Sequence, residues 1–238
     1  MESATSRAST ASGAAQKRTK ICVYCGSSAG NDPAHAEAAR SLARLMAANK
    51  IDLVYGGGTV GLMGEVAKTL VALAGPQSVH GIIPEALVRY ERDPTYTSKQ
   101  LKSENNKRLA LPEESVFGMT TVVEDMHTRK RMMAQEVIAG GPGSGFIALS
   151  GGYGTVEELF ETATWNQLGI HNKGICVLNI NGFYDGILAW IKNSVGEGFI
   201  HGDNKRIIAE AKTPEEAIQA LKDYKVSDSV YKLSWGKE

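Results

Sequence analysis

Short apolar segments alternate with longer amphipathic segments along most of this 238-residue chain, and this alternation constrains the fold more than any other feature. The apolar segments have the length and residue types of buried β-strands, and the segments between them repeat their apolar residues with a helical period. Strands that alternate with helices form a parallel sheet, because each helix carries the chain back across the sheet. The sequence therefore predicts an α/β fold, with a doubly wound parallel sheet in a single domain.

The predicted boundaries follow from this pattern and from helix-capping residues. Asp32 and Pro33 have the residue types of an N-cap and a first helical position, and Thr213 and Glu216 have the spacing of a capping box. No clear periodicity appears between about residues 89 and 114. Strands are expected at 20–26, 51–58, 78–84, 120–125, 146–151, 174–180 and 206–211, and helices at 31–50, 60–75, 126–141, 155–169, 183–198 and 213–224.

Composition limits the partners and the compartment. Residues 1–19 are rich in Ser, Ala and Thr, which predicts a disordered tail rather than the alternative of a transit peptide. Residues 20–224 form the predicted domain, and 225–238 a polar C-terminal tail. The net charge is zero, which disfavours a nucleic-acid partner, and no apolar run is long enough to span a membrane.

Three cysteines predict free thiols in a reducing cytoplasm. Cys22 and Cys25 form a C-x-x-C pair, but this pair lies at the end of a predicted strand. Residues three apart in a strand point to opposite faces, and no second pair of ligands completes a metal set. We therefore interpret both cysteines as structural and predict no metal site.

Three predicted strands end in glycine-rich loops, with the sequences CGSSAG, YGGGTVGLMG and LSGGYGT. Such loops meet at one edge of a parallel sheet, where their N–H groups can converge on an anion. The second loop contains G-x-G-x-x-G at Gly56, Gly58 and Gly61, but no acidic residue follows at the end of the next strand, as NAD binding requires. No G-K-[ST] follows either, so a P-loop is excluded. We predict no cofactor.

Two basic residues occupy an unusual position in the predicted helix 126–141. Met126, Met133 and Val137 form one apolar stripe, with Lys130 inside it and Arg129 at its border. Two interpretations are open at this point. Both side chains could extend their charged ends to water, or they could line a cleft that binds a phosphate or carboxylate.

A pair of carboxylates, Glu157 and Glu158, opens the predicted helix 155–169. Acidic residues in a first helical turn stabilise the helix through its dipole, which would explain one of them. Both are expected to lie off the core stripe of Val156, Leu159, Phe160 and Ala163. Because a carboxylate repels a phosphate in the glycine loop, the alternative is that it acts on the next part of the ligand, such as a sugar with a breakable bond.

Two motifs carry a resemblance to a known family. MHTRK at 126–130 and GGYGTVEEL at 151–159 resemble the paired M-H-x-R-K and P-G-G-x-G-T-x-E-E motifs of the LONELY GUY (LOG) family, cytokinin-activating phosphoribohydrolases with a Rossmann-like fold. The first two glycine loops also resemble those of the family, and the resemblance runs from about residue 20 to about 210. Members have also carried the label "lysine decarboxylase", but nothing in this sequence resembles a pyridoxal-phosphate lysine site.

The resemblance implies a reaction and a set of residues. Water would cleave the N-glycosidic bond of a cytokinin riboside 5′-monophosphate, and of AMP, to give the free base and ribose 5-phosphate. Arg129 and Glu158 match the catalytic pair, and Glu157 matches the preceding glutamate. The predicted substrate-binding residues are Lys130, Gly151, Gly152, Gly154, Thr155, Ser27, Gly57, Gly58 and Met126. A homodimer or larger homo-oligomer is implied, with its sites near the subunit interface.

The sequence departs from the family pattern in three places. Ser150 stands where the motif has proline, and residues 139–145 and 89–114 are longer than expected. The longer segments affect assembly and substrate range more than chemistry. Two alternative functions remain open: a general purine nucleotide nucleosidase unrelated to cytokinins, and a nucleotide-binding carrier without hydrolysis.

Overall fold

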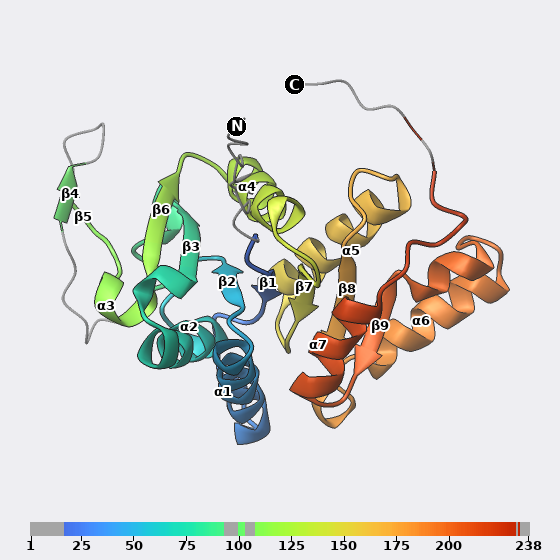
Figure 1. Cartoon of the computed structure of the whole chain (residues 1–238), viewed down its shortest axis with the longest axis horizontal. Helices are drawn as coiled ribbons and strands as arrows, with labels where there is room; N and C mark the ends of the chain where they lie inside the picture. The colour runs from blue at the N-terminus through green and yellow to red at the C-terminus, as the bar shows by residue number, and fades with distance from the viewer. Residues whose placement is uncertain (1–16, 93–99, 103–107, 232, 234–238) are drawn as a thin grey trace, which may run out of the picture.

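The computed structural model describes residues 17–92, 100–102, 108–231 and 233, and its centre is a sheet of seven parallel strands. The sheet order is β6-β3-β2-β1-β7-β8-β9, with every neighbouring pair parallel (Figure 1). The strand bounds are β1 Lys20–Tyr24, β2 Asp52–Tyr55, β3 Val79–Pro84, β6 Met119–Val123, β7 Gly145–Ala148, β8 Gly174–Leu178 and β9 Ile208–Ala211. All seven predicted strands are present.

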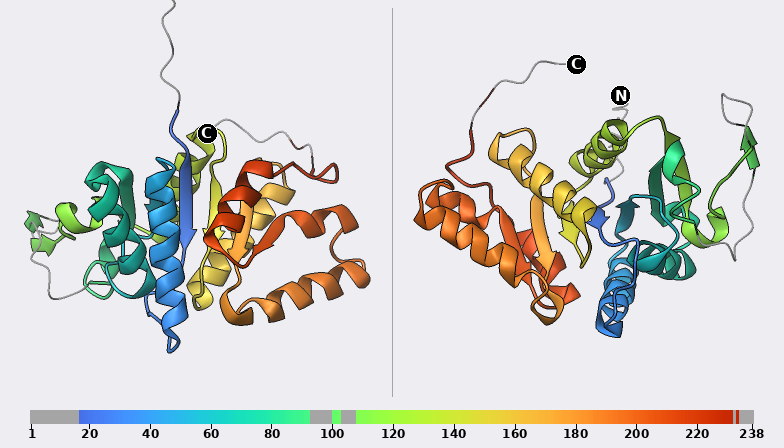
Figure 2. Two further views of the ribbon diagram at one scale, coloured as in Figure 1. Left: turned by 60° about the horizontal axis from the view of Figure 1, so that its bottom comes forward. Right: turned by 180° about the vertical axis from the view of Figure 1, so that it is seen from behind.

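Helices cover both faces of this sheet, so the predicted doubly wound α/β fold is confirmed (Figures 1 and 2). The six long helices were all expected. One face carries α1 (Pro33–Ala48), α2 (Gly61–Ala74) and α7 (Pro214–Asp223), and the other carries α4 (Met126–Ala139), α5 (Tyr153–Gln167) and α6 (Asp185–Gly196).

Strand β1 shows how the sequence divides the core between the two faces. Ile21 and Val23 pack under α1 and α2, whereas Cys22 and Tyr24 pack on the side of α4 and α5. Alternation with period two places successive side chains on opposite faces, and each large side chain buried in this way contributes about 1.5–3 kcal/mol. Cys25 joins the first core, opposite Cys22, and both thiols are free and buried, as predicted.

The predicted helix caps are also present. The Asp32 carboxylate accepts a hydrogen bond from the Ala34 N–H, and Pro33 is the first residue of α1. The Thr213 hydroxyl accepts from the Glu216 N–H, while the Glu216 carboxylate accepts from the Lys212 N–H, one residue before the expected position. These bonds satisfy N–H groups that a helix start leaves without partners.

Helix α5 corrects two expectations. It begins at Tyr153, so Glu157 and Glu158 lie in its second turn and the dipole explanation for them is wrong. The expected core stripe is confirmed only in part: Leu159 is fully buried and Phe160 and Ala163 pack partly buried against the core, but Glu158, expected off the stripe, is buried too. The buried face carries Thr155, Glu158, Leu159, Thr162 and Asn166. Polar residues are tolerated on this face because several find internal partners: Thr162 bonds the Tyr24 hydroxyl, and Asn166 bonds the Lys173 carbonyl and the Tyr224 hydroxyl.

The aperiodic segment 89–114 contains two short strands and ends at a short helix. A short antiparallel pair, β4 (Gln100–Lys102) and β5 (Arg108–Ala110), lies away from the main sheet, and the one-turn helix α3 (Glu114–Phe117) follows it (Figure 1). Residues 93–99 and 103–107 lie outside the described residues, as do residues 1–16 of the predicted N-terminal tail and parts of the predicted C-terminal tail. The predicted boundaries of the tails stay predictions.

The strand order places a crevice at the centre of the sheet. From β1 the chain adds β2, β3 and then β6 on one side, and later β7, β8 and β9 on the other. The connections that leave β1 and β7 therefore run in opposite directions. In open parallel sheets, ligands bind at such a switch point, outside the carboxyl ends of the strands.

At the opposite ends of the strands, a polar cluster joins α4 to the sheet. The Glu136 carboxylate accepts from the Lys20 ammonium at 2.6 Å and pairs with the His80 ring, which also bonds the Thr121 hydroxyl. Burial raises the pKa of Glu136, but the hydrogen bonds from His80 and Lys20 outweigh burial and lower it to about 2. The ionised carboxylate is therefore stabilised by folding.

We expect Glu136→Gln to lower the free energy of unfolding by about 1–3 kcal/mol near neutral pH, because His80 and Lys20 lose a charged acceptor. The folded-state pKa lies below the ordinary value of 4.5. The stabilisation is thus complete above that value and is lost as the pH falls toward the folded-state pKa. Urea denaturation at several pH values measures it. A difference between wild type and variant that stays constant under acid conditions would contradict this account.

Candidate active site

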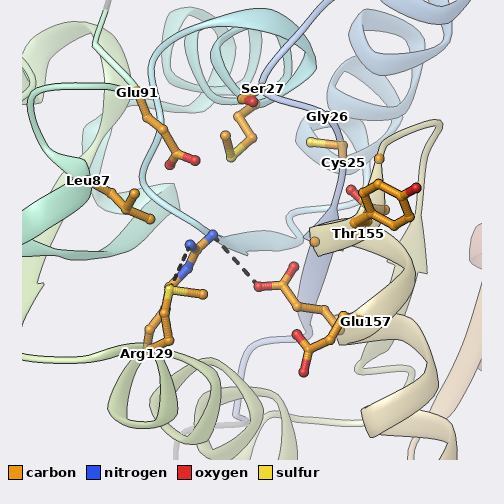
Figure 3. A pocket seen from close by; sticks show the side chains of 14 residues that line it. Cys25, Gly26, Ser27, Leu87, Glu91, Arg129, Thr155 and Glu157 are labelled. Atoms are coloured by element: carbon orange, nitrogen blue, oxygen red, sulfur yellow. Dashed lines mark hydrogen bonds and ion pairs between the residues drawn. The ribbon is translucent and has the colours of Figure 1, made fainter.

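A cavity of about 360 Å³ opens at the switch point, above the carboxyl ends of β1 and β7 (Figure 3). Its volume suits a small organic ligand. Residues from both halves of the sheet form its wall, which explains why segments distant in sequence meet there. The fourteen lining residues are Cys25, Gly26, Ser27, Met63, Leu87, Glu91, Met126, Arg129, Gly152, Tyr153, Gly154, Thr155, Glu157 and Glu158.

The start of helix α5 forms one side of the cavity. The Val156 N–H donates to the Gly152 carbonyl, so the N–H groups of Tyr153, Gly154 and Thr155 precede the helical hydrogen-bond ladder. A Cβ atom added at Gly152 or Gly154 would meet no atom within 4 Å. The backbone is thus accessible from the cavity, and N–H groups at a helix start attract an anion.

Arg129 enters the cavity from α4 and is 6% exposed. Its guanidinium lies 3.7 Å from the Glu158 carboxylate, and another of its nitrogens contacts the Met126 sulfur (Figure 3). Within the part of the chain that the structure describes, its Nε has no hydrogen-bond partner. The side chain therefore does not extend to open water, and of the two interpretations of this helix the cleft is the one that fits Arg129.

Gly56 provides the space for this arginine. A Cβ atom at Gly56 would lie 1.9 Å from a terminal guanidinium nitrogen of Arg129. This is the first glycine of the G-x-G-x-x-G pattern at the end of β2, so this glycine accommodates an arginine side chain. Sequence reasoning did not assign Gly56 to the site.

Glu158 faces the arginine from the buried side of α5 and is 8% exposed. Burial raises the pKa of this carboxyl from its ordinary 4.5 to about 7, the Arg129 charge opposes the rise, and Glu157 adds to it. Both protonation states are therefore populated near neutral pH. A carboxyl in this condition can give or accept a proton during a reaction.

A third carboxylate, Glu91, lines the cavity on the side away from Glu157 (Figure 3). It follows β3, and its carbonyl accepts from the N–H and hydroxyl of Thr59. Among the described residues its buried Oε2 has no hydrogen-bond partner; burial raises the pKa of the carboxyl, and the Arg129 charge opposes the rise. Nothing in the aperiodic segment around Glu91 distinguished it in the sequence.

Lys130 lies behind the cavity wall. Its ammonium pairs with Glu157 at 2.6 Å and with Glu161 at 3.0 Å, so it joins α4 to α5 and is not among the lining residues. Glu157 lines the cavity at its open side, with 52% of its side chain exposed. The structure thus separates the two adjacent glutamates: one is buried against arginine, and the other is exposed beside lysine.

Three predicted glycines also lie outside the cavity wall. Gly57 packs against Ile83 of β3, and Gly58 lies behind Met63 and Glu91. Gly151 is held between Thr155 and the Gly26 N–H, where a side chain would not fit. Their effect on a ligand is therefore indirect, through the residues they support. The other predicted residues, Ser27, Gly152, Gly154, Thr155, Met126, Arg129, Glu157 and Glu158, all line the cavity.

Two further properties bear on the kind of site. No group of three or more His, Cys, Asp or Glu side chains within the described ranges is arranged to hold a metal ion. None of the helices that the structure describes has the length and apolarity of a membrane span.

Known proteins resemble this chain over most of its length. A family model described as "Possible lysine decarboxylase" matches residues 63–221. A cytokinin riboside 5′-monophosphate phosphoribohydrolase of Arabidopsis thaliana is 41% identical, over 91% of this chain and 89% of its own. A bifunctional cytokinin biosynthesis protein of Fusarium pseudograminearum is 54% identical over 84% of this chain, which spans only 39% of that relative.

The chain belongs to the LOG family. A molybdenum cofactor binding protein from Rippkaea orientalis shares the fold of this LOG-family chain, with a TM-score of 0.56 at 19% identity over 87% of this chain and 96% of its own. The description "lysine decarboxylase" does not suit the cavity. Pyridoxal-phosphate enzymes bind their cofactor through a lysine, and none of the fourteen lining residues is a lysine.

Replacement of the neighbours of Glu158 should move its pKa in opposite directions. Arg129→Gln removes the charge that lowers the pKa, so the pKa should rise above the wild-type value of about 7. Glu157→Gln removes a like charge, so the pKa should fall. Carbon-13 NMR titration of the glutamate side chains measures both shifts. Shifts of the same sign in the two variants would contradict the explanation of the Glu158 pKa by burial, the Arg129 charge and the Glu157 charge.

Proposed function

We propose that this chain hydrolyses the N-glycosidic bond of cytokinin riboside 5′-monophosphates, and of AMP, to give the free base and ribose 5-phosphate. The observation that carries the proposal is the buried pair of Arg129 and Glu158, 3.7 Å apart beside the start of α5. A site that only held a phosphate would not need a buried carboxyl group close to the anion. Relatives named as phosphoribohydrolases support the same reaction.

The 5′-phosphate would bind at the start of α5. The open backbone at Gly152 and Gly154 lets phosphate oxygens approach the N–H groups, and Thr155 and Ser27 also line the cavity. The helix dipole adds favourable charge at this point. Binding there would direct the attached ribose toward the second turn of the helix, where Glu158 and Glu157 lie.

The chemical step exchanges one bond for another. Water forms a bond to C1′ of the ribose, the bond from C1′ to the base nitrogen breaks, and the proton that water loses balances the one that the base gains. Positive charge develops on the sugar ring as the bond breaks. An ionised Glu158 would stabilise this charge or orient the water, and Glu157 would hold a ribose hydroxyl.

Arg129 would act on the same atoms from the other side. Its charge keeps part of the Glu158 population ionised despite burial. Its Nε, which has no partner among residues 17–92, 100–102, 108–231 and 233, offers a donor for phosphate or for the departing base. Lys130, through Glu157, would set the charge at the cavity mouth. The buried Arg129 charge acts strongly because little water screens it.

The general purine nucleosidase and the nucleotide carrier are distinguished from this function by products. Incubation with AMP, GMP and isopentenyladenosine monophosphate, followed by chromatography, detects any free base. Release from the cytokinin nucleotide supports the proposal, release from AMP and GMP alone supports the general nucleosidase, and tight binding with no release supports the carrier.

We also propose that the chain acts as a homodimer or larger homo-oligomer in the cytoplasm. An apolar groove between α5 and α6 includes Phe160 and Trp190, and the Trp190 side chain is 52% exposed. Exposed apolar surface of this kind favours association between subunits. The three buried free thiols suit a reducing compartment.

Glu158→Gln should reduce the rate of base release by about 100-fold or more, because the amide cannot carry charge or exchange a proton. Glu161→Gln is the matched control: Glu161 pairs with the same Lys130 one turn away but does not line the cavity. Its rate should stay within about threefold of wild type. Rates come from chromatography of released adenine. A fully active, folded Glu158→Gln protein would remove Glu158 from the mechanism.

Gly56→Ala should reduce kcat/KM by about 10- to 100-fold, because the added methyl group occupies the position of the Arg129 guanidinium. Gly186→Ala in α6, where a Cβ atom meets nothing within 4 Å, is the control and should retain activity. Steady-state kinetics with AMP measures the change. Unchanged kinetics in Gly56→Ala would mean that the arginine does not need its present position.

A further inference from the structure

Ser150 occupies the turn between β7 and α5, where the LOG motif has proline. Proline fixes one backbone dihedral angle and so restricts a turn without any partner. Serine provides no such restriction. The turn must nevertheless be fixed, because it leads directly into Gly152 and the N–H groups at the start of α5.

Two hydrogen bonds hold Ser150 in place. Its hydroxyl lies 2.9 Å from Nδ1 of His35, a residue of α1, and its carbonyl accepts from the Gly26 N–H at 3.0 Å. Ser150 is 7% exposed, so its hydroxyl has little access to water as an alternative partner. The turn is therefore tied both to the loop after β1 and to a helix on the other side of that loop.

The loop before α6 contacts both His35 and the turn that contains Ser150. The Phe183 ring packs edge-on against the imidazole, with ring centroids 5.7 Å apart. The Tyr184 hydroxyl donates to the carbonyl of Leu149 at 2.6 Å, one residue before Ser150. These contacts fix the imidazole and the backbone on which the serine depends.

Among the described residues, no carboxylate is hydrogen-bonded to the His35 imidazole, so the serine–histidine pair lacks the third group of a hydrolytic triad there. A nucleophilic serine needs a histidine that is oriented by a carboxylate. Asp32 is near in sequence, but its two oxygens already accept from the Ala34 N–H and the Asn181 amide. The pair therefore has the construction of a structural tie and not of a nucleophile.

We propose that the Ser150–His35 hydrogen bond is a positioning device that replaces proline and holds the start of α5 for binding of a 5′-phosphate. The inference rests on the proposed function, since it names how the same site keeps its phosphate-binding geometry. Ser150 and His35 are positioning residues: neither lines the cavity that holds Arg129 and Glu158, although both line an adjacent hollow that shares Gly26, Ser27 and Gly152 with it. Both act on the 5′-phosphate through the backbone that follows Ser150. Loss of this hydrogen bond should weaken the binding of ligands that carry the phosphate and should not change the binding of other ligands.

The test compares binding of ribose 5-phosphate with binding of adenine by calorimetry, in wild type, Ser150→Ala, His35→Phe, the double variant and Ser150→Pro. Phenylalanine keeps the ring against Phe183 and removes the nitrogen. Each variant that removes the hydrogen bond should weaken the binding of ribose 5-phosphate by about 3- to 10-fold, which corresponds to one hydrogen bond. The double variant should bind it no more weakly than either single variant, because both substitutions remove the same bond. Ser150→Pro should bind ribose 5-phosphate as tightly as the wild type, because proline fixes the turn without the hydrogen bond. The affinity for adenine should be the same in all of these proteins. In turnover, KM should rise while kcat changes little.

The outcomes separate the two proposals. A wild-type protein that binds neither ligand and hydrolyses no nucleotide contradicts the proposed function. A wild-type protein that binds ribose 5-phosphate, together with a Ser150→Ala variant that binds it equally well, overturns the positioning device alone. Additive losses in the double variant, or equal losses for adenine, would also overturn it, because they indicate two separate or nonspecific effects. Thermal denaturation establishes that each variant is folded.

Discussion

The buried contact between Arg129 and Glu158 is the interaction on which the rest of this site depends. Burial of a charge costs free energy unless it is paired, and this pair is incomplete: the two groups are 3.7 Å apart, and one arginine nitrogen has no hydrogen-bond partner in the described part of the chain. The raised pKa of Glu158 expresses the same incompleteness. A pair selected for stability alone would be closer and fully bonded, so the arrangement is better explained by a ligand that completes it.

Small residues make this contact and its surroundings accessible. Gly56 gives the guanidinium room to enter, and Gly152 and Gly154 leave the backbone at the start of α5 uncovered. Larger side chains would block the arginine at one position and the ligand at the others. The glycines that the sequence presents as similar loops therefore have different functions, and Gly57, Gly58 and Gly151 serve to pack the loops together.

Much of the fold and of the candidate site could be predicted from the sequence, because these features depend on local sequence patterns. Short apolar runs predicted every strand of the main sheet, helical periodicity predicted the six long helices, and capping residues located two helix starts. Residues that depend on long-range packing were missed. The buried face of α5 carries Thr162 and Asn166 because distant tyrosines bond them, and Glu91 reaches the cavity through a segment with no periodicity. Gly56 was missed because its role is defined by a side chain from another helix.

Helix α4 leaves an edge strand, β6, yet it packs back over β1, β2 and β3, and so it carries Arg129 to the middle of the sheet. Glu158 comes from the helix that follows β7, the strand hydrogen-bonded to β1. Both groups are thus mounted on the part of a domain that exchanges its amide hydrogens last. Fraying at either margin of the sheet would leave their separation intact, and heat inactivation would coincide with cooperative melting of the whole domain and not precede it.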